Sequence, residues 1–207
     1  NAPFSQCLVR LRINDWVNRK IQINRSYQEM FKKARSHIYI MSSYFLPGNL
    51  FRRSLVAAAR RGVAIRIILA GKSDVPMARH AERYVWRWLL RNGMEIYEYE
   101  PTVLHAKLST YDGKWMTVGS YNLNNISAYA SIELNLDVLD ENFVSDVEAM
   151  LSEIIRFDCV KITEKEFEQH NHLHKRVWQW ICYQLIRIIF KLFTFYFRQH
   201  DEDFHYQ

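Results

Sequence analysis

Short apolar runs of strand length alternate along most of the chain with longer segments of helical period. The clearest strand pattern is HIYIMS, His37 to Ser42, which the breaker pair Pro47-Gly48 follows. Asn49 can cap a helix that ends at Gly62, and the strand-like run Val63 to Ala70 comes directly after it. Because strand and helix alternate, we predict an α/β fold in which helices flank a layered β-sheet.

The same alternation continues to residue 156 and then stops. The further elements expected are a helix from about Ser73 to Gly93, strands at Met94 to Tyr99, Val103 to Tyr111, Trp115 to Val118 and Ile132 to Leu139, and a helix from about Asn142 to Arg156. From about Thr163 the pattern is helical throughout. We therefore expect a domain at residues 1–160 and a helical, aromatic-rich C-terminal appendage at residues 161–207.

A histidine and a lysine stand two residues apart in the predicted strand that begins at Val103. Successive strand side chains alternate between faces, so His105 and Lys107 should project to the same side. Asp112 follows in the turn Asp-Gly, a hairpin signal that leads into a neighbouring antiparallel strand. The same residues also have an ordinary structural interpretation, a hydrogen-bonded histidine, a solvated lysine and a turn aspartate.

Three further polar residues belong to the same stretch. Ser120 and Asn122 lie in the segment GSYN that ends the next strand, and they could instead cap a short helix. Glu133 alternates with Ile132 and Leu134, so its carboxylate faces the opposite way from these apolar side chains.

Phosphate chemistry needs this combination of side chains. An imidazole can attack phosphorus or protonate a leaving alcohol, and Glu133 could fix its tautomer. A lysine ammonium and an asparagine amide donate hydrogen bonds to phosphate oxygens as charge develops during transfer. We therefore expect neither a metal nor a cofactor.

The joint spacing is H-x-K at His105, then Asp112, then Gly119-Ser120-x-Asn122, then Glu133, and it resembles the phospholipase D superfamily, also called the HKD family. Residues 26–143 are also similar to the second half of bacterial cardiolipin synthases, which share Tyr-Phe-x-Pro, Arg-Gly-Val and Gly-Lys-Ser-Asp segments. The sequence departs from many of those synthases after Asn122, where LNNIS replaces a segment with an aspartate and an Arg-Ser pair.

The resemblance implies a mixed sheet in an α/β/α sandwich and an active site built from two H-x-K motifs. It implies catalytic roles for His105, Lys107, Asp112 and Glu133, and phosphate binding by His105, Lys107, Ser120 and Asn122. His37 and His80 lack the following lysine, so this chain carries one motif. Either the sequence is the C-terminal half of a two-motif enzyme, which the resemblance favours, or two copies pair.

In the intact enzyme the resemblance implies transfer of a phosphatidyl group between two phosphatidylglycerol molecules through a phosphohistidine. The N-terminal motif usually supplies the nucleophile in such enzymes, so His105 would act as acid and base. The alternatives are a single-motif endonuclease or phosphodiesterase that works as a homodimer, and a pairing module that only completes a partner's site.

A formal charge of +6 suits a phosphate-bearing partner, either an anionic membrane or a nucleic acid. The resemblance favours phosphatidylglycerol at a membrane surface over nucleic acid, with a peripheral location at the bacterial cytoplasmic membrane. Cys7, Cys159 and Cys182 are isolated, which predicts neither a disulfide framework nor a thiolate zinc site. The first residues resemble neither a signal peptide nor a native start, so we interpret the sequence as mature or truncated.

The segment from Lys175 to His200 is dense in aromatic and aliphatic residues, but Arg187 and Lys191 interrupt it. These charges argue against a membrane-spanning helix. An interfacial helix anchored by Trp178, Trp180, Phe193 and Phe197 fits this composition. A helix packed on its own domain, or across a dimer, fits it equally well. His170, His172 and His174 alternate without a completing cysteine or carboxylate cluster, so we expect no zinc site there.

Overall fold

The computed structural model of the chain describes residues 7–73, 75–124, 127–128 and 131–204. Its strands are β1 (Val9–Asp15), β2 (Lys20–Ile21), β3 (His37–Ser42), β4 (Ala64–Lys72), β5 (Glu95–Val103), β6 (Lys107–Tyr111), β7 (Trp115–Gly119), β8 (Ile132–Val138) and β9 (Cys159–Ile162). Its helices are α1 (Gln22–Lys33), α2 (Asn49–Arg60), α3 (Pro76–Arg91), α5 (Glu141–Asp158), α6 (Glu164–His170) and α7 (Leu173–Phe204).

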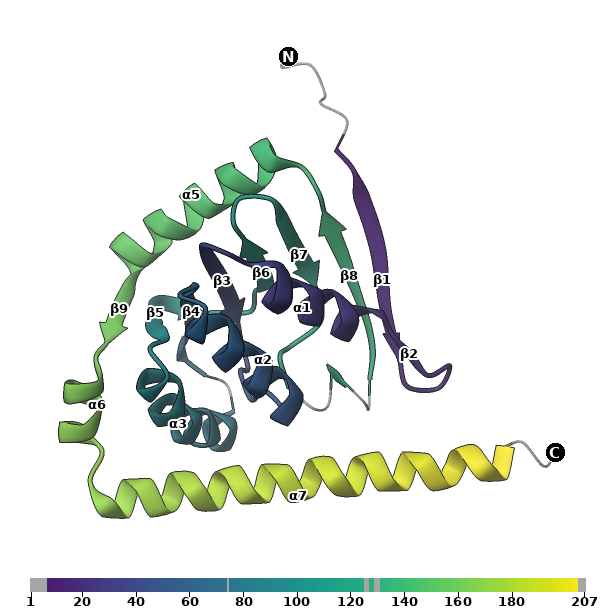
Figure 1. Cartoon of the computed structure of the whole chain (residues 1–207). Coiled ribbons are helices and arrows are strands. Elements are labelled where there is room, and N and C mark those ends of the chain that lie inside the picture. The colour runs from purple at the N-terminus through teal and green to yellow at the C-terminus, as the bar shows by residue number, and fades with distance from the viewer. Residues whose placement is uncertain (1–6, 74, 125–126, 129–130, 205–207) are drawn as a thin grey trace.

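Nine strands of the described chain form one sheet in the order β2-β1-β8-β7-β6-β3-β4-β5-β9 (Figure 1). Strands β3, β4 and β5 are parallel, because α2 and α3 return the chain to the same edge between them. The remaining pairings are antiparallel. The predicted α/β fold with a mixed sheet flanked by helices is therefore confirmed.

The central strand β3 is buried on both faces, which explains its unbroken apolar run. Ile38 and Ile40 belong to the main core with residues of α1, α2 and α3. Tyr39 and Met41 point to the other face and cluster with Leu151 of α5. The sheet is thus the middle of three layers.

The structure corrects one predicted strand and adds three. Residues 104–106 are not in a strand, so the predicted run Val103 to Tyr111 is divided between β5 and β6. Strands β1, β2 and β9 had not been predicted. The division of the chain at residue 160 stays a prediction; in the structure, Cys159–Ile162 pairs with β5, and Phe167 of α6 joins the main core.

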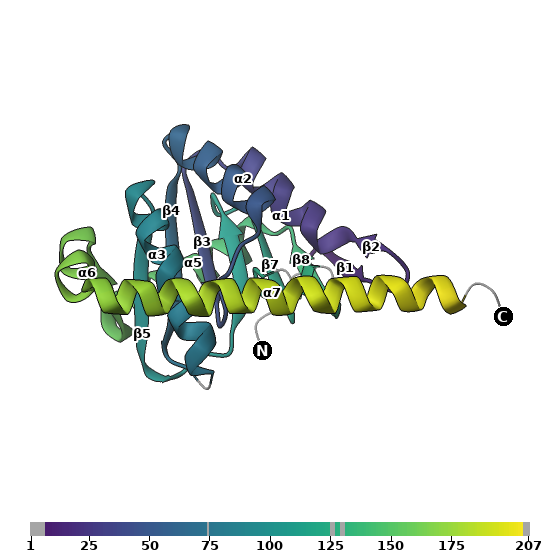
Figure 2. The same cartoon turned by 90° about the horizontal axis from the view of Figure 1, so that it is seen from below.

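The C-terminal helix α7 packs along α3. Its contact stripe consists of residues at helical spacing that are buried or half-buried, namely Gln179, Cys182, Tyr183, Ile186 and Phe190. Seen from below, α7 crosses the molecule beneath the sheet (Figure 2). Phe193 and Phe197 belong to α7, but their side chains lie outside the described part.

None of the helices formed by the described residues has the length and apolar character that crossing a bilayer requires.

Candidate active site

The H-x-K segment and the G-S-x-N segment meet at one edge of the sheet. Leu108 of β6 pairs with Val118 of β7, so Lys107 lies beside Gly119, and Ser42 at the end of β3 pairs with Lys107. His105 precedes β6 in the short connection from β5, and it is exposed. The sheet register therefore places the exposed histidine next to the ends of two neighbouring strands.

The ammonium of Lys107 is buried beside the histidine backbone. Lys107 is only 8% exposed, and its Nζ donates to Ser43 Oγ at 3.3 Å and to the carbonyl oxygen of His105 at 3.4 Å. Burying an ammonium is costly unless its protons are hydrogen-bonded, so these contacts stabilise its position. The sequence prediction had not included Ser43, although a polar residue after a buried strand at a sheet edge is a signal for a site residue.

Ser120 and Glu133 form a second polar pair at this edge. Ser120 donates its hydroxyl proton to Glu133 Oε2 and accepts the backbone N–H of Leu134 at 3.0 Å. Ser131 donates to the other carboxylate oxygen at 2.8 Å. In the described residues, the side-chain hydrogen bonds of Glu133 thus go to these two serines. Its action on the His105 tautomer stays a prediction.

Gly119 lets strands β7 and β8 approach closely beside this pair. A Cβ at this position would lie 2.2 Å from the carbonyl oxygen of Leu134 and 2.7 Å from Cα of Asn135. Both are backbone atoms, so a side chain could fit only if a strand moved. The glycine therefore fixes the position of Ser120 against Glu133.

Asn122 lies in the loop that leaves β7. Its backbone N–H donates to Ser127 Oγ at 3.3 Å. Its Oδ1 is buried and has no hydrogen-bond partner among the described residues. A buried polar atom without a partner costs free energy, so the amide of Asn122 retains unused hydrogen-bonding capacity at the edge of the sheet.

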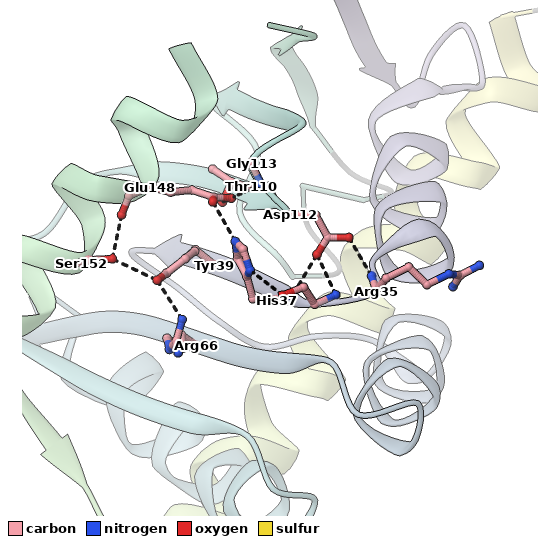
Figure 3. Close-up of polar contacts among 10 residues, drawn as sticks. Arg35, His37, Tyr39, Arg66, Thr110, Asp112, Gly113, Glu148 and Ser152 are labelled. Carbon is pink, nitrogen blue, oxygen red and sulfur yellow. Dashed lines mark hydrogen bonds and ion pairs between the residues drawn. The ribbon is translucent and has the colours of Figure 1, made fainter. Parts of the chain in front are cut away.

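Asp112 lies at the opposite end of β6, roughly 17 Å of strand away from Lys107. It accepts the backbone N–H groups of Arg35, Ser36 and His37 at 2.8, 2.9 and 2.8 Å (Figure 3). Burial raises the pKa of Asp112, but these backbone donors outweigh that effect and hold the pKa below its ordinary value. The structure does not bring Asp112 together with His105 and Lys107.

A polar network surrounds Asp112 at this end. His37 Nε2 contacts Glu148 Oε2 at 2.7 Å, and Thr110 donates to Glu148 Oε1 at 2.7 Å. Tyr39 accepts a hydrogen bond from Arg66 at 2.8 Å and contacts Ser152 at 3.0 Å (Figure 3). These contacts connect β3, β4 and β6 to α5, which indicates a structural function for the network.

A buried carboxyl group supports the loop after β3. Glu82 Oε1 accepts the backbone N–H of Phe45 at 2.9 Å, and the next residue, Leu46, donates to the carbonyl of Leu123 at 3.0 Å. Burial raises the pKa of Glu82 to about 8, although the Phe45 N–H acts in the opposite direction. Glu82 is thus largely neutral at pH 7 and positions a loop that contacts the residue after Asn122.

The described residues contain no group of three or more histidine, cysteine, aspartate or glutamate side chains that could hold a metal ion. The three cysteines are free thiols.

Comparison with known proteins agrees with this fold. Residues 27–155 match the family model "Cardiolipin synthase, PLD-like domain". The chain belongs to the phospholipase D-like family. It is 34% identical to cardiolipin synthase B of Escherichia coli K12 over 178 residues, which are 86% of this chain and 42% of that protein. The chain therefore spans less than half the length of this relative.

Solved structures show the same fold. The phospholipase D family member Nuc from Salmonella typhimurium superposes with a TM-score of 0.62 at 15% identity, over 76% of this chain and 99% of that chain. Phosphatidylserine synthase from Haemophilus influenzae gives a TM-score of 0.68 at 16% identity, over 89% of this chain and 46% of that chain. The fold of this chain thus corresponds to nearly all of one protein and to about half of the other.

Proposed function

We propose that this chain supplies one half of the active site of a cardiolipin synthase-type phosphatidyltransferase. The observation that carries the proposal is the edge at which exposed His105 adjoins the buried ammonium of Lys107, beside the strand that leads to Ser120 and Asn122. A phosphodiester bound there would have an imidazole for proton or phosphoryl transfer and an ammonium for its oxygens. Phosphatidylglycerol is the proposed substrate, and a bacterial cytoplasmic membrane the proposed location.

In the proposed reaction a histidine of the second half attacks phosphorus of phosphatidylglycerol, and His105 protonates the glycerol oxygen as its bond to phosphorus breaks. A hydroxyl of another phosphatidylglycerol then loses its proton to His105 and attacks the phosphohistidine. Cardiolipin and glycerol are the products. Lys107 and the Nδ2 group of Asn122 donate to the phosphate oxygens. Ser120 joins them only when its single hydroxyl proton turns from Glu133 to the phosphate, because a hydroxyl donates one hydrogen bond.

An exposed apolar face of the sheet is an argument that a second half of the enzyme packs against this chain. Side chains on one face of β1, β7 and β8 are exposed next to the Ser120–Glu133 pair, namely Leu11, Val118, Ile132, Leu134 and Leu136. Leu11 pairs with Leu136, and Leu136 pairs with Val118, so these side chains are contiguous. Since the matched synthase is more than twice as long, we assign this face to the other half of the enzyme.

The test measures conversion of phosphatidylglycerol to cardiolipin and glycerol by the chain paired with a second H-x-K half. We expect His105→Ala and Lys107→Ala each to lower turnover by at least about 100-fold, because general acid–base and electrostatic catalysis have magnitudes of this order. His172→Ala, which changes an exposed histidine outside this edge, is the matched control and should retain activity.

Cardiolipin formation by His105→Ala at the normal rate would exclude the site as assigned. Cleavage of DNA by the isolated chain, dependent on His105 and without lipid turnover, would instead support the endonuclease alternative. A chain that binds its second half but in which His105 and Lys107 are dispensable would be a pairing module.

A further inference from the structure

A pocket between α3 and the first turns of α7 contains none of the residues of the candidate active site. Its volume is about 570 Å³, within the range of small-molecule sites. Five arginines line it, and its lining includes no carboxylate: Arg52, Arg83, Arg87, Arg91 and Arg176. We call it the arginine pocket.

The positive charge of the arginine pocket is only partly neutralised. Glu168 pairs with both Arg87 and Arg91, at 3.2 and 3.3 Å. Arg91 also approaches Glu164 at 3.6 Å. Arg176 is exposed and forms no ion pair with any of the described residues. The pocket therefore keeps a surplus of cationic groups, which favours an anionic ligand.

The two remaining arginines of the pocket, Arg83 and Arg52, are held in position by neighbouring side chains. Arg83 contacts Glu98 at 2.9 Å, but that carboxylate also pairs with Arg79. Arg52 lies over the ring of Trp88 at 5.2 Å. The Nε–H of Arg87 is buried and has no hydrogen-bond partner in the described chain. Because this nitrogen is inaccessible, a ligand would contact the rest of the Arg87 guanidinium, whose side chain is 32% exposed.

The wall that α7 contributes is apolar as well as basic. Leu173, Val177 and Trp180 follow helical spacing, line the pocket and are 73, 48 and 48% exposed. The exposed apolar surface continues along α7 through Leu185, Ile188 and Leu192, away from the stripe that packs on α3. Guanidinium groups thus lie beside an exposed apolar surface, which matches a ligand that has both a phosphate and acyl chains.

We propose that the arginine pocket binds the phosphate of an anionic phospholipid while Leu173, Val177 and Trp180 contact its acyl region. This site is separate from the proposed transfer chemistry and serves to dock the chain on a bilayer. The proposed site extends the interfacial interpretation of the C-terminal segment, because one stripe of α7 packs on α3 and another contacts lipid.

The test is sedimentation of the chain with vesicles of phosphatidylcholine alone or with added phosphatidylglycerol. We expect binding only with the anionic lipid. Arg176→Gln should weaken it about fivefold, since a basic residue near an anionic surface contributes about 1 kcal/mol. Arg91→Gln with Arg176→Gln should weaken it about 25-fold if the two sites are independent.

Arg60→Gln is the matched control, because it removes the same charge from an exposed position of α2 outside the pocket. Equal affinities of Arg176→Gln and Arg60→Gln would overturn the proposal. Binding of inorganic phosphate that Arg176→Gln weakens, together with no binding to the anionic vesicles, would also overturn it, by showing a site for free phosphate. The readout is binding, so inactivity in the transfer assay leaves this result interpretable.

Discussion

The buried carboxyl group of Glu82 predicts an unusual dependence of stability on pH. In the folded chain its pKa is about 8, against an ordinary value of 4.5. Between these values the folded state binds more protons than the unfolded state, so stability must fall as pH rises. The contribution is fully present below pH 4.5 and is lost progressively as pH rises through 8.

The size of the effect follows from the difference between the two pKa values. One pKa unit corresponds to about 1.4 kcal/mol, so Glu82 should make the chain about 3 kcal/mol less stable at pH 7 than at pH 4.5. Glu82→Gln keeps an oxygen that can accept the Phe45 N–H and removes the ionisation. The variant should therefore lose this part of the pH dependence.

Urea unfolding of both proteins at several pH values measures the effect. We expect the variant to gain stability relative to the original chain as pH rises from 4.5 to 8. Glu29→Gln, a change at an exposed position, is the control and should leave the profile unchanged. Parallel profiles for the original chain and Glu82→Gln would refute the argument, because they would mean that Glu82 ionises normally in the folded state.

Two other substitutions test the scaffold around the site. Asp112→Ala should lower the free energy of unfolding by about 3 kcal/mol, because three backbone donors lose a charged acceptor. Chemical denaturation measures this loss, and an unchanged denaturation midpoint would contradict the structural function of Asp112. The loss should disappear in acid, as pH falls through the lowered pKa of Asp112. Gly119→Ala should lower the free energy of unfolding by about 1–3 kcal/mol, because the added methyl group overpacks the space between β7 and β8. It should also reduce turnover in the assay with the second half. Normal stability of this variant would show that β7 and β8 separate easily.

The centre of the sheet could be predicted because its strands carry local signals. HIYIMS is buried on both faces, so its whole length is apolar, and the breaker pair at Pro47 marks the end of the segment. The spacing from His105 to Glu133 also predicted which segments meet, because hairpin connections bring consecutive strands side by side. Asp112 has the predicted turn position, but no local pattern shows that its partners are the backbone of residues 35–37.

The edge strands depend on distant partners. Strand β1 alternates apolar and polar residues in VRLRIND, a pattern that could have been recognised, and it pairs with β8 more than one hundred positions away. Strand β9 has only four residues, which is too short for a period to be visible. Likewise Glu82 occupies a helix with many charged residues, and only the approach of the Phe45 loop makes it a buried group.

The exposure of His105 bears on why a second half is needed. Transfer to an alcohol requires that water be kept from the phosphohistidine, because water would hydrolyse it. In this chain His105 is exposed, while the ammonium of Lys107 is buried against the backbone of His105, so the fold encloses this phosphate-binding group but leaves the proton-transfer group open to water. Under the proposed function, the second half must supply both the nucleophile and the surface that excludes water. Transfer of a phosphatidyl group to an alcohol by this chain without a second half would contradict this argument.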